Sequence, residues 1–254
     1  PDKKELNIIS ELINFDLSSF SIAPSMSILE SGVYNFRSKD LEHLIEVSNI
    51  KGGSLVLLDH SMRLINASLT IKDLQNLEGI IFFNFDDKKN IKANLLGYEL
   101  RHKPNIQLKT RIDLDPKRFY SDQDFLQLDG ETKIDLNIIF SNESIRAIAK
   151  TNFIGTSFNS PFTYMRKSSD EPLDTDIFYE NKTRSLKVTN NKLDVYLPNL
   201  TQNSALIHLG KAKTKLTKNL RPNQYYLIAE LDSFSTDELF NFLSSQKPSS
   251  NQIK

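Results

Sequence analysis

Hydrophobic and polar residues alternate along much of this chain, with the period of two that is typical of β-strands having one dry face and one wet face. The clearest example runs from Ile106 to Leu114, and similar stretches run from Lys133 to Phe140 and from Ile145 to Phe153. The apolar positions expected to share a face in these stretches are Ile106, Leu108, Ile112, Leu114, Ile134, Leu136, Ile138, Phe140, Ile145, Ala147, Ala149 and Phe153. This pattern predicts a mainly β structure.

Further stretches extend the β pattern toward both ends of the chain. Ile65 to Ile71 and Tyr225 to Leu231 alternate in the same way, so each predicts a strand with one apolar face. Residues 39 to 50 fit either a helix or a strand, and we favour a strand. The run from Ile80 to Phe85 is apolar at successive positions, which predicts a strand buried on both sides or one that contacts lipid.

Turn signals separate the predicted strands. They lie at Lys51–Gly53, Asp86–Asn90, Ser141–Ser144 and Asn190–Lys192. Because these connections are too short for a crossover helix, neighbouring strands are expected to be antiparallel. The chain has only 8 glycines, so Asn and Asp are expected to supply the unusual backbone angles at most turns.

Helical patterns are confined to the two ends of the chain. An amphipathic helix is predicted over Pro1–Asn14, and Ser235–Glu238 has the pattern of a capping box that begins a second short helix. The expected fold is a long curved antiparallel meander sheet with one or two short helices. Two short helices cannot cover a dozen apolar strand faces, and exposed apolar surface costs about 25 cal/mol per Å². Either the sheet folds back as a sandwich or barrel, or its apolar face holds something else, such as acyl chains.

Composition narrows the possible partners. Lys and Arg number 32 and Asp and Glu also number 32, so no net charge would attract a nucleic acid. The absence of cysteine excludes disulfides and thiolate metal sites. No apolar run approaches the roughly 20 residues of a membrane-spanning helix. Because the chain begins at Pro1 without a Met, we interpret it as an internal fragment whose membrane anchor would lie elsewhere.

The candidate chemical motifs do not indicate catalysis. Asp59, His60 and Ser61 have the residue types of a triad, but consecutive strand residues point to opposite faces, so a hairpin end is the better interpretation. The remaining histidines have no metal-ligand spacing. They are His43, His102 and His208.

Two charged stretches have ordinary explanations as well. The acidic stretch from Asp113 to Glu131 lacks the ligand spacing of a calcium loop, so it predicts a solvated loop. Lys211, Lys213 and Lys215 alternate and would contact lipid phosphates or form a charged strand face or edge. We therefore expect no enzyme activity, no metal and no cofactor.

A series of short motifs follows one another in the second half of the chain. They are Leu128–Gly130, Thr151–Phe162, Lys167, Glu171–Leu173, Ala205–Gly210 and Leu231–Leu239. Their order resembles the AsmA-like family, in particular its YhdP branch, where a strand ends in a Gly, a turn and a Lys follow, and Glu-Pro-Leu begins the next strand. Leu239 stands where that branch usually has Trp.

The resemblance implies a repeating β-groove in the periplasmic part of a protein anchored in the inner membrane. Such a protein would pass phospholipid between the inner and outer membranes of a Gram-negative envelope and support outer-membrane integrity. Residues 1–127 would form the N-terminal part of the groove, 128–245 the YhdP-like segment and 246–254 a flexible tail. Its partners would be phospholipid acyl chains and, through the rest of the parent protein, the envelope membranes. The alternative is a self-contained β-sandwich that acts as an adhesin or protein-binding module.

Overall fold

The structure of this protein is a computed structural model that describes most of the chain from residue 21 to residue 237. The described residues are 21–35, 40–57, 60–73, 75–86, 88–100, 105–118, 127–142, 144–160, 163–202, 204–210, 222–223, 225–230 and 236–237. The strands are β1 (Ser21–Asn35), β2 (Asp40–Leu57), β3 (His60–Lys72), β4 (Asn76–Phe85), β5 (Lys88–Tyr98), β6 (Asn105–Leu114), β7 (Gln127–Gly130), β8 (Thr132–Ser141), β9 (Ile145–Thr151), β10 (Thr156–Asn159), β11 (Thr175–Glu180), β12 (Ser185–Thr189), β13 (Leu193–Leu197), β14 (Ala205–Gly210) and β15 (Tyr225–Glu230). Two 3-10 turns, η2 (Pro116–Arg118) and η3 (Thr163–Met165), accompany them. The predicted mainly β fold is confirmed.

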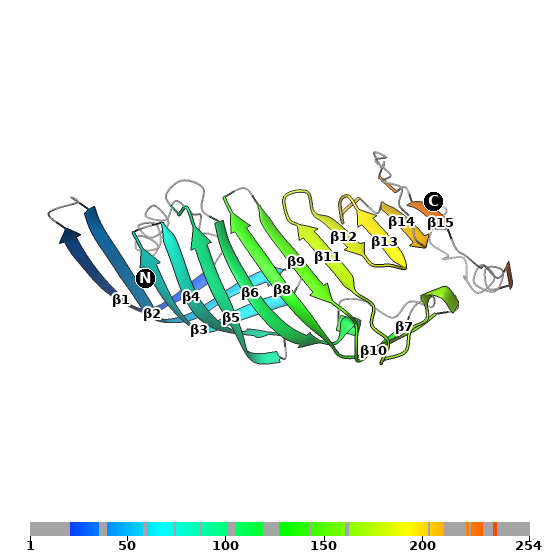
Figure 1. The fold of residues 1–254 in the computed structure, drawn as a ribbon, viewed down its shortest axis with the longest axis horizontal. Helices are drawn as coiled ribbons and strands as arrows, with labels where there is room; N and C mark the ends of the chain where they lie inside the picture. Colours follow the sequence, from blue (N-terminus) through cyan, green and yellow to red (C-terminus); the bar gives the residue numbers. More distant parts are fainter. Residues whose placement is uncertain are drawn as a thin grey trace, which may run out of the picture. The chain divides into compact units, whose positions relative to one another are not determined.

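Thirteen strands form one hydrogen-bonded sheet in the order β1-β2-β3-β4-β5-β6-β8-β9-β11-β12-β13-β14-β15 (Figure 1). The other two strands, β7 and β10, pair with each other as a separate antiparallel sheet. Consecutive strands of the large sheet pair in antiparallel fashion from β1 to β6, as the short connections predict. The expectation of antiparallel neighbours is wrong at one place, because β15 lies parallel to β14. Their connection is long enough for the chain to return to the same end of the sheet.

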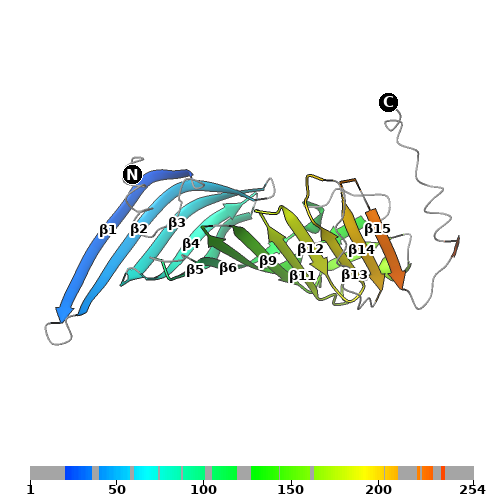
Figure 2. The same cartoon turned by 90° about the horizontal axis from the view of Figure 1, so that it is seen from above.

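The chain divides into two compact units that are interleaved in sequence. The described residues up to Ile112, with Asp135–Ile148 and Glu180–Lys182, form the first unit. The described residues of Asp113–Ile134, Ala149–Tyr179 and Thr183–Lys254 form the second. The first unit contains the longest strands, and β1 to β3 bend along their length (Figure 2).

The structure confirms how this glycine-poor chain makes its turns. The eight described non-glycine residues with positive φ include five Asn or Asp residues, because these side chains tolerate the left-handed region better than others do. These five are Asn49, Asp73, Asp86, Asn90 and Asn223. At the β4–β5 turn, the side-chain oxygen of Asn84 also accepts the backbone N–H of Asn90 at 3.0 Å.

Two local predictions are wrong, and each has a structural reason. Lys51–Gly53 does not form a turn but lies inside β2, beside irregularities in the pairing of β1 with β2. Of the two interpretations of β4, burial on both sides is wrong, because Ile80 and Phe82 are 39% and 37% exposed while Phe83 and Phe85 are buried. Contact of these exposed residues with lipid stays a prediction. Residues 40–50, ambiguous in sequence, belong to β2 as favoured.

Of the predicted helices, Pro1–Asn14 lies outside the described residues. So does the C-terminal helix except for Thr236 and Asp237, which are helical. The predicted flexible tail, 246–254, and the alternating lysines Lys211, Lys213 and Lys215 lie outside them too.

Candidate functional site

The first unit has an apolar face that follows directly from the register of its strands. Residues directly opposite one another on adjacent strands point to the same side of a sheet. One row of opposite residues across β2 to β6 is Ile45, Ile71, Leu77, Gly97 and Ile106, and the next is Val47, Leu69, Gly79, Leu95 and Leu108. The alternation predicted from sequence therefore places apolar side chains in rows across five strands, with one glycine in each row.

Much of this face in the first unit is closed to water by the protein itself. The exposed fractions are 2% for Phe83, 4% for Leu108 and 0% for Ile138. Around Val47 and Ala67, the partly buried side chains of the same unit form a packed cluster; they are Ile45, Leu64, Leu69 and Ile81. These residues thus stabilise the fold by about 25 cal/mol for each Å² of apolar surface removed from water.

The predicted groove residues divide into two groups by burial. The buried ones are Ile106, Leu108, Ile112, Leu114, Ile138, Phe140 and Ala147. The partly buried ones are Ile134, Leu136, Ile145, Ala149 and Phe153, of which Leu136 and Ile145 belong to the first unit. The placement of Phe153 on a strand face is wrong: β9 ends at Thr151, and Phe153 has a positive φ and packs edge-on against the ring of Phe158.

The second unit has an apolar face that was not predicted from the sequence. Strands β12, β13 and β14 pair so that Leu186 is opposite Leu197, Val188 is opposite Val195, and Val195 is opposite Ile207. Seven Leu, Val and Ile residues occupy this face, and all seven are partly buried, whereas Ala205 on the same face of β14 is buried; the seven are Leu186, Val188, Leu193, Val195, Leu197, Ile207 and Leu209. We call these seven residues the aliphatic face. The signal was present in the sequence as alternation, but strands of five or six residues make it short.

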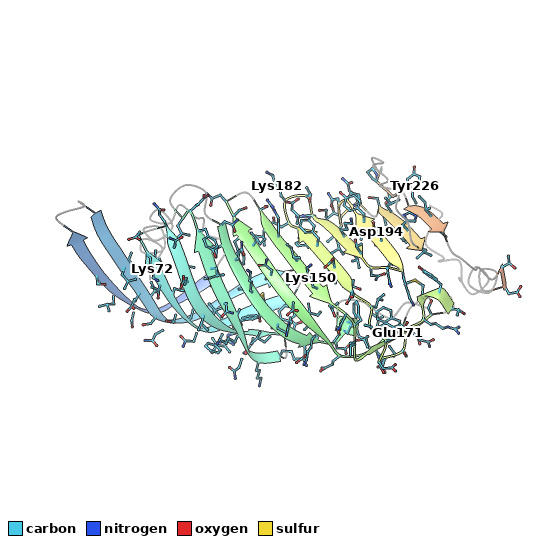
Figure 3. All side chains as sticks on the ribbon, in the orientation of Figure 1. Lys72, Lys150, Glu171, Lys182, Asp194 and Tyr226 are labelled. Carbon is cyan, nitrogen blue, oxygen red and sulfur yellow. The ribbon has the colours of Figure 1, made fainter. Side chains whose placement is uncertain are left out.

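Opposite-charge pairs link neighbouring strands within each unit, and one pair links η2 to β7. In the first unit, Arg111 binds Asp135 through two hydrogen bonds, the Nη2–Oδ2 bond measuring 2.9 Å. The other pairs are Arg146–Glu180, Lys150–Asp176, Lys187–Asp194 and Lys117–Asp129 (Figure 3 labels Lys150 and Asp194). Lys187 and Asp194, whose side chains are 50% and 43% exposed, lie on the side of β12 and β13 opposite the aliphatic face, whereas on β14 that side carries the buried His208.

The Arg111–Asp135 pair leads to a testable pH effect. Hydrogen bonding to Arg111 lowers the pKa of Asp135 below its ordinary value of 3.8. The pair therefore stabilises the fold above that value, and its contribution is lost as the pH falls through the lowered pKa. Replacing Arg111 with Ala should raise the pKa of Asp135 toward 3.8, as measured by carboxyl NMR titration, whereas Arg146→Ala should leave it unchanged. An unchanged Asp135 pKa in Arg111→Ala would contradict the pairing.

A buried lysine contacts several parts of the segment between β9 and β11, which includes β10. Lys167 is 5% exposed, and its Nζ donates to the backbone carbonyls of Phe153, Thr156 and Ser168 at 2.8, 2.7 and 2.7 Å. The three N–H groups of the ammonium are thus all used, and Nζ lies 5.6 Å from the centre of the Phe158 ring. Burial lowers the pKa of Lys167, while Glu171 and Asp170 act in the opposite direction. With its donors occupied, Lys167 acts as a structural clamp.

Two glycines allow the backbone at Gly155 to lie directly against the end of β7. Gly130 and Gly155 have φ values of +109° and +91°. A Cβ atom on Gly130 would lie 2.1 Å from the Gly155 carbonyl oxygen, and one on Gly155 would lie 2.4 Å from that of Glu131. Gly130, Gly155 and Lys167 lie within the motifs that resemble the AsmA-like family, but neither the close approach of the two glycines nor the burial of the lysine was predicted from the sequence.

The other candidate residues do not come together as a group in the described part of the chain. His60 and Ser61 begin β3 opposite Leu57 and Val56, which is the predicted hairpin end, and Asp59 lies outside the described residues. His208 is buried, and its Nε2 has no hydrogen-bond partner. In the same part of the chain, no three His, Asp or Glu side chains lie close enough together to bind a metal ion.

Comparison with known proteins assigns the chain to no family. No protein-family model, no curated protein and no solved structure matches this chain. Over the described ranges, no helix has both the length and the apolar character that crossing a membrane requires.

Proposed function

We propose that this chain is a segment of an inner-membrane-anchored periplasmic protein that passes phospholipid between the inner and outer membranes. Acyl chains would contact apolar faces of the sheet, while head groups would stay near its wet side. The observation that supports this most directly is the aliphatic face of the second unit. The compartment and the membrane anchor rest on the resemblance of the second half of the chain to the AsmA-like family.

The chemistry of the aliphatic face suits acyl chains. Its seven side chains are Leu, Val and Ile, so they offer no hydrogen bond and only non-directional contact. Each methylene group of a lipid that becomes fully buried there would contribute about 0.8 kcal/mol. Such a surface distinguishes poorly between lipids, which suits passage of bulk phospholipid and does not require a catalytic group.

The β-sandwich expected for the alternative is wrong, because the described strands form one 13-stranded sheet and one 2-stranded sheet. A self-contained adhesin or protein-binding module is still a second candidate, and the first unit favours it. Its apolar side chains Phe83, Leu108 and Ile138 are already closed to water. On the face that carries these buried side chains, a lipid could reach partly buried positions such as Leu136 and Ile145, while the exposed Ile80 and Phe82 lie on the other face of β4. The two functions therefore differ in whether the aliphatic face of the second unit binds lipid.

The test compares adjacent residues on opposite faces of β13. Val195 belongs to the aliphatic face, and Tyr196 lies on the other side and is 39% exposed. We expect the chain, purified after incubation with phosphatidylethanolamine–phosphatidylglycerol vesicles, to carry lipid detectable by native mass spectrometry. Val195→Glu should lower bound lipid about tenfold, equivalent to about 1.4 kcal/mol, because a carboxylate resists desolvation by an acyl chain. Tyr196→Glu should retain it.

Circular dichroism of both variants must show the same strand content as the parent. Equal lipid in the two variants would remove the aliphatic face from the mechanism. A parent chain that binds no lipid would favour the protein-binding module.

A further inference from the structure

A lysine lies at one end of the aliphatic face. Lys192 directly precedes β13, and its carbonyl oxygen accepts the backbone N–H of Gly210, the last residue of β14, at 2.9 Å. Leu193 and Leu209 come next along these two strands, stand opposite each other and belong to the aliphatic face. Lys192 is therefore at the rim of that face, where the head group of a bound amphiphile would lie.

Contacts with the segment around η3 hold the Lys192 side chain in place. Its Nζ donates to the carbonyl oxygen of Arg166 at 3.0 Å and lies 5.9 Å from the centre of the Tyr164 ring. Arg166 follows η3 directly, and its Nε donates to the carbonyl oxygen of Ser160 at 2.7 Å. We call Lys192 and Arg166 the basic pair. The fold thus brings together two cationic residues that are 26 positions apart in sequence.

The donors of the basic pair are used only in part. One N–H of the Lys192 ammonium group goes to a carbonyl oxygen, and the Arg166 guanidinium group uses its Nε. Over the described ranges, no carboxylate forms a salt bridge with either residue, and the ion pairs of this unit involve Lys117, Lys150 and Lys187. Arg166 is exposed and Lys192 is partly buried. Two ammonium N–H groups and the terminal guanidinium N–H groups can therefore bind an anion.

The charges around the basic pair also favour an anion. Lys192 lowers the pKa of Lys167, although burial has the larger effect, while Glu171 and Asp170 act in the opposite direction. With Arg166, the three positive groups exceed the two carboxylates by one formal charge. A phosphodiester has one negative charge, so it complements this region.

We propose that the basic pair binds the phosphodiester of a phospholipid whose acyl chains lie on the aliphatic face, an inference that rests on the function proposed above. Arginine and lysine donate charge-assisted hydrogen bonds to phosphate oxygens, and these bonds are stronger than neutral ones. The basic pair thereby adds a preference that apolar contact alone cannot provide. The face favours phospholipids over uncharged lipids that have the same acyl chains.

The test compares two lipids that differ only in the head group. The full chain is titrated in detergent micelles with phosphatidylglycerol or with diacylglycerol of the same acyl chains, and bound lipid is measured by native mass spectrometry. The parent should bind phosphatidylglycerol more tightly. Lys192→Gln and Arg166→Gln should each weaken phosphatidylglycerol binding about tenfold and leave diacylglycerol binding unchanged, because each removes a charge but keeps a side-chain donor.

Two further variants separate the effect of charge from an effect on the fold. Arg166→Lys keeps the charge, so it should bind phosphatidylglycerol more tightly than Arg166→Gln does. Lys187→Gln removes a lysine from the opposite side of the sheet and should bind both lipids as the parent does. Circular dichroism of every variant must show the strand content of the parent.

Phosphatidylglycerol binding that is unchanged in both Gln variants, or weakened equally with diacylglycerol binding, would overturn the phosphate site and leave lipid binding by the aliphatic face in place. A parent that binds neither lipid would overturn the proposed function as well. Calorimetry with inorganic phosphate tests the other source of the same chemistry. An affinity equal to that for phosphatidylglycerol would assign the basic pair to free phosphate and contradict the proposal.

Discussion

Replacing Lys167 with Met is expected to lower the free energy of unfolding of the second unit by about 3 kcal/mol, because three backbone carbonyls lose a charged donor. A hydrogen bond to a charged group contributes about 1.5 to 3 kcal/mol. The loss from all three hydrogen bonds should be smaller than three times this contribution, because the folded state must also desolvate the ammonium group. The lowered pKa of Lys167 indicates this desolvation. Methionine keeps the length of the apolar stem, so the loss reports on the hydrogen bonds.

Lys150→Met is the matched control for this experiment. Lys150 pairs with Asp176 at 3.2 Å, but both side chains are more than 60% exposed, so its replacement should change stability by less than about 0.5 kcal/mol. Chemical denaturation followed by far-ultraviolet circular dichroism measures both variants. Similar stabilities for Lys167→Met and the parent would show that Lys167 does not act as a clamp.

Gly155→Ala is expected to destabilise the same region by about 3 kcal/mol. Two effects combine: the backbone has a φ of +91°, which costs a non-glycine residue about 1 to 3 kcal/mol, and the new Cβ would meet the Glu131 carbonyl oxygen. Relief of that contact requires the chain around Gly155 to move away from Glu131. The Thr156 and Phe158 N–H groups donate to Phe153 and Lys167, so the amide protons that report on the pairing of β10 with β7 are those of Ser157 and Asn159. These two should exchange faster with solvent, because β10 would separate from β7.

Ile154→Ala controls for a change at the neighbouring position. Ile154 is 49% exposed, so its truncation should change stability little. Gly130→Ala should resemble Gly155→Ala, because its Cβ would approach the Gly155 carbonyl oxygen. Normal amide protection of β10 in both alanine variants would contradict the close approach of these two segments.

Some of the candidate site could be predicted from local sequence and some could not. The burial of Ile106, Leu108 and Ile112 follows from alternation within one strand. The wrong placement of Phe153 arose because alternation continues past Thr151 in sequence, while the chain turns away there. The aliphatic face was missed because each of its strands is short, and only their register joins Val188, Val195 and Ile207 into one surface.

The sequence by itself determined the fold class, the faces of the long strands and the use of Asn and Asp at turns. These properties depend on backbone geometry and on neighbours one or two residues away, so a local pattern contains them. Only the tertiary structure decided the pairing of β7 with β10, the parallel placement of β15, and the burial of Lys167 among three carbonyls. Each of these depends on contacts between segments that are distant in sequence, and an alternating pattern has no information about which partner a strand or a lysine will meet.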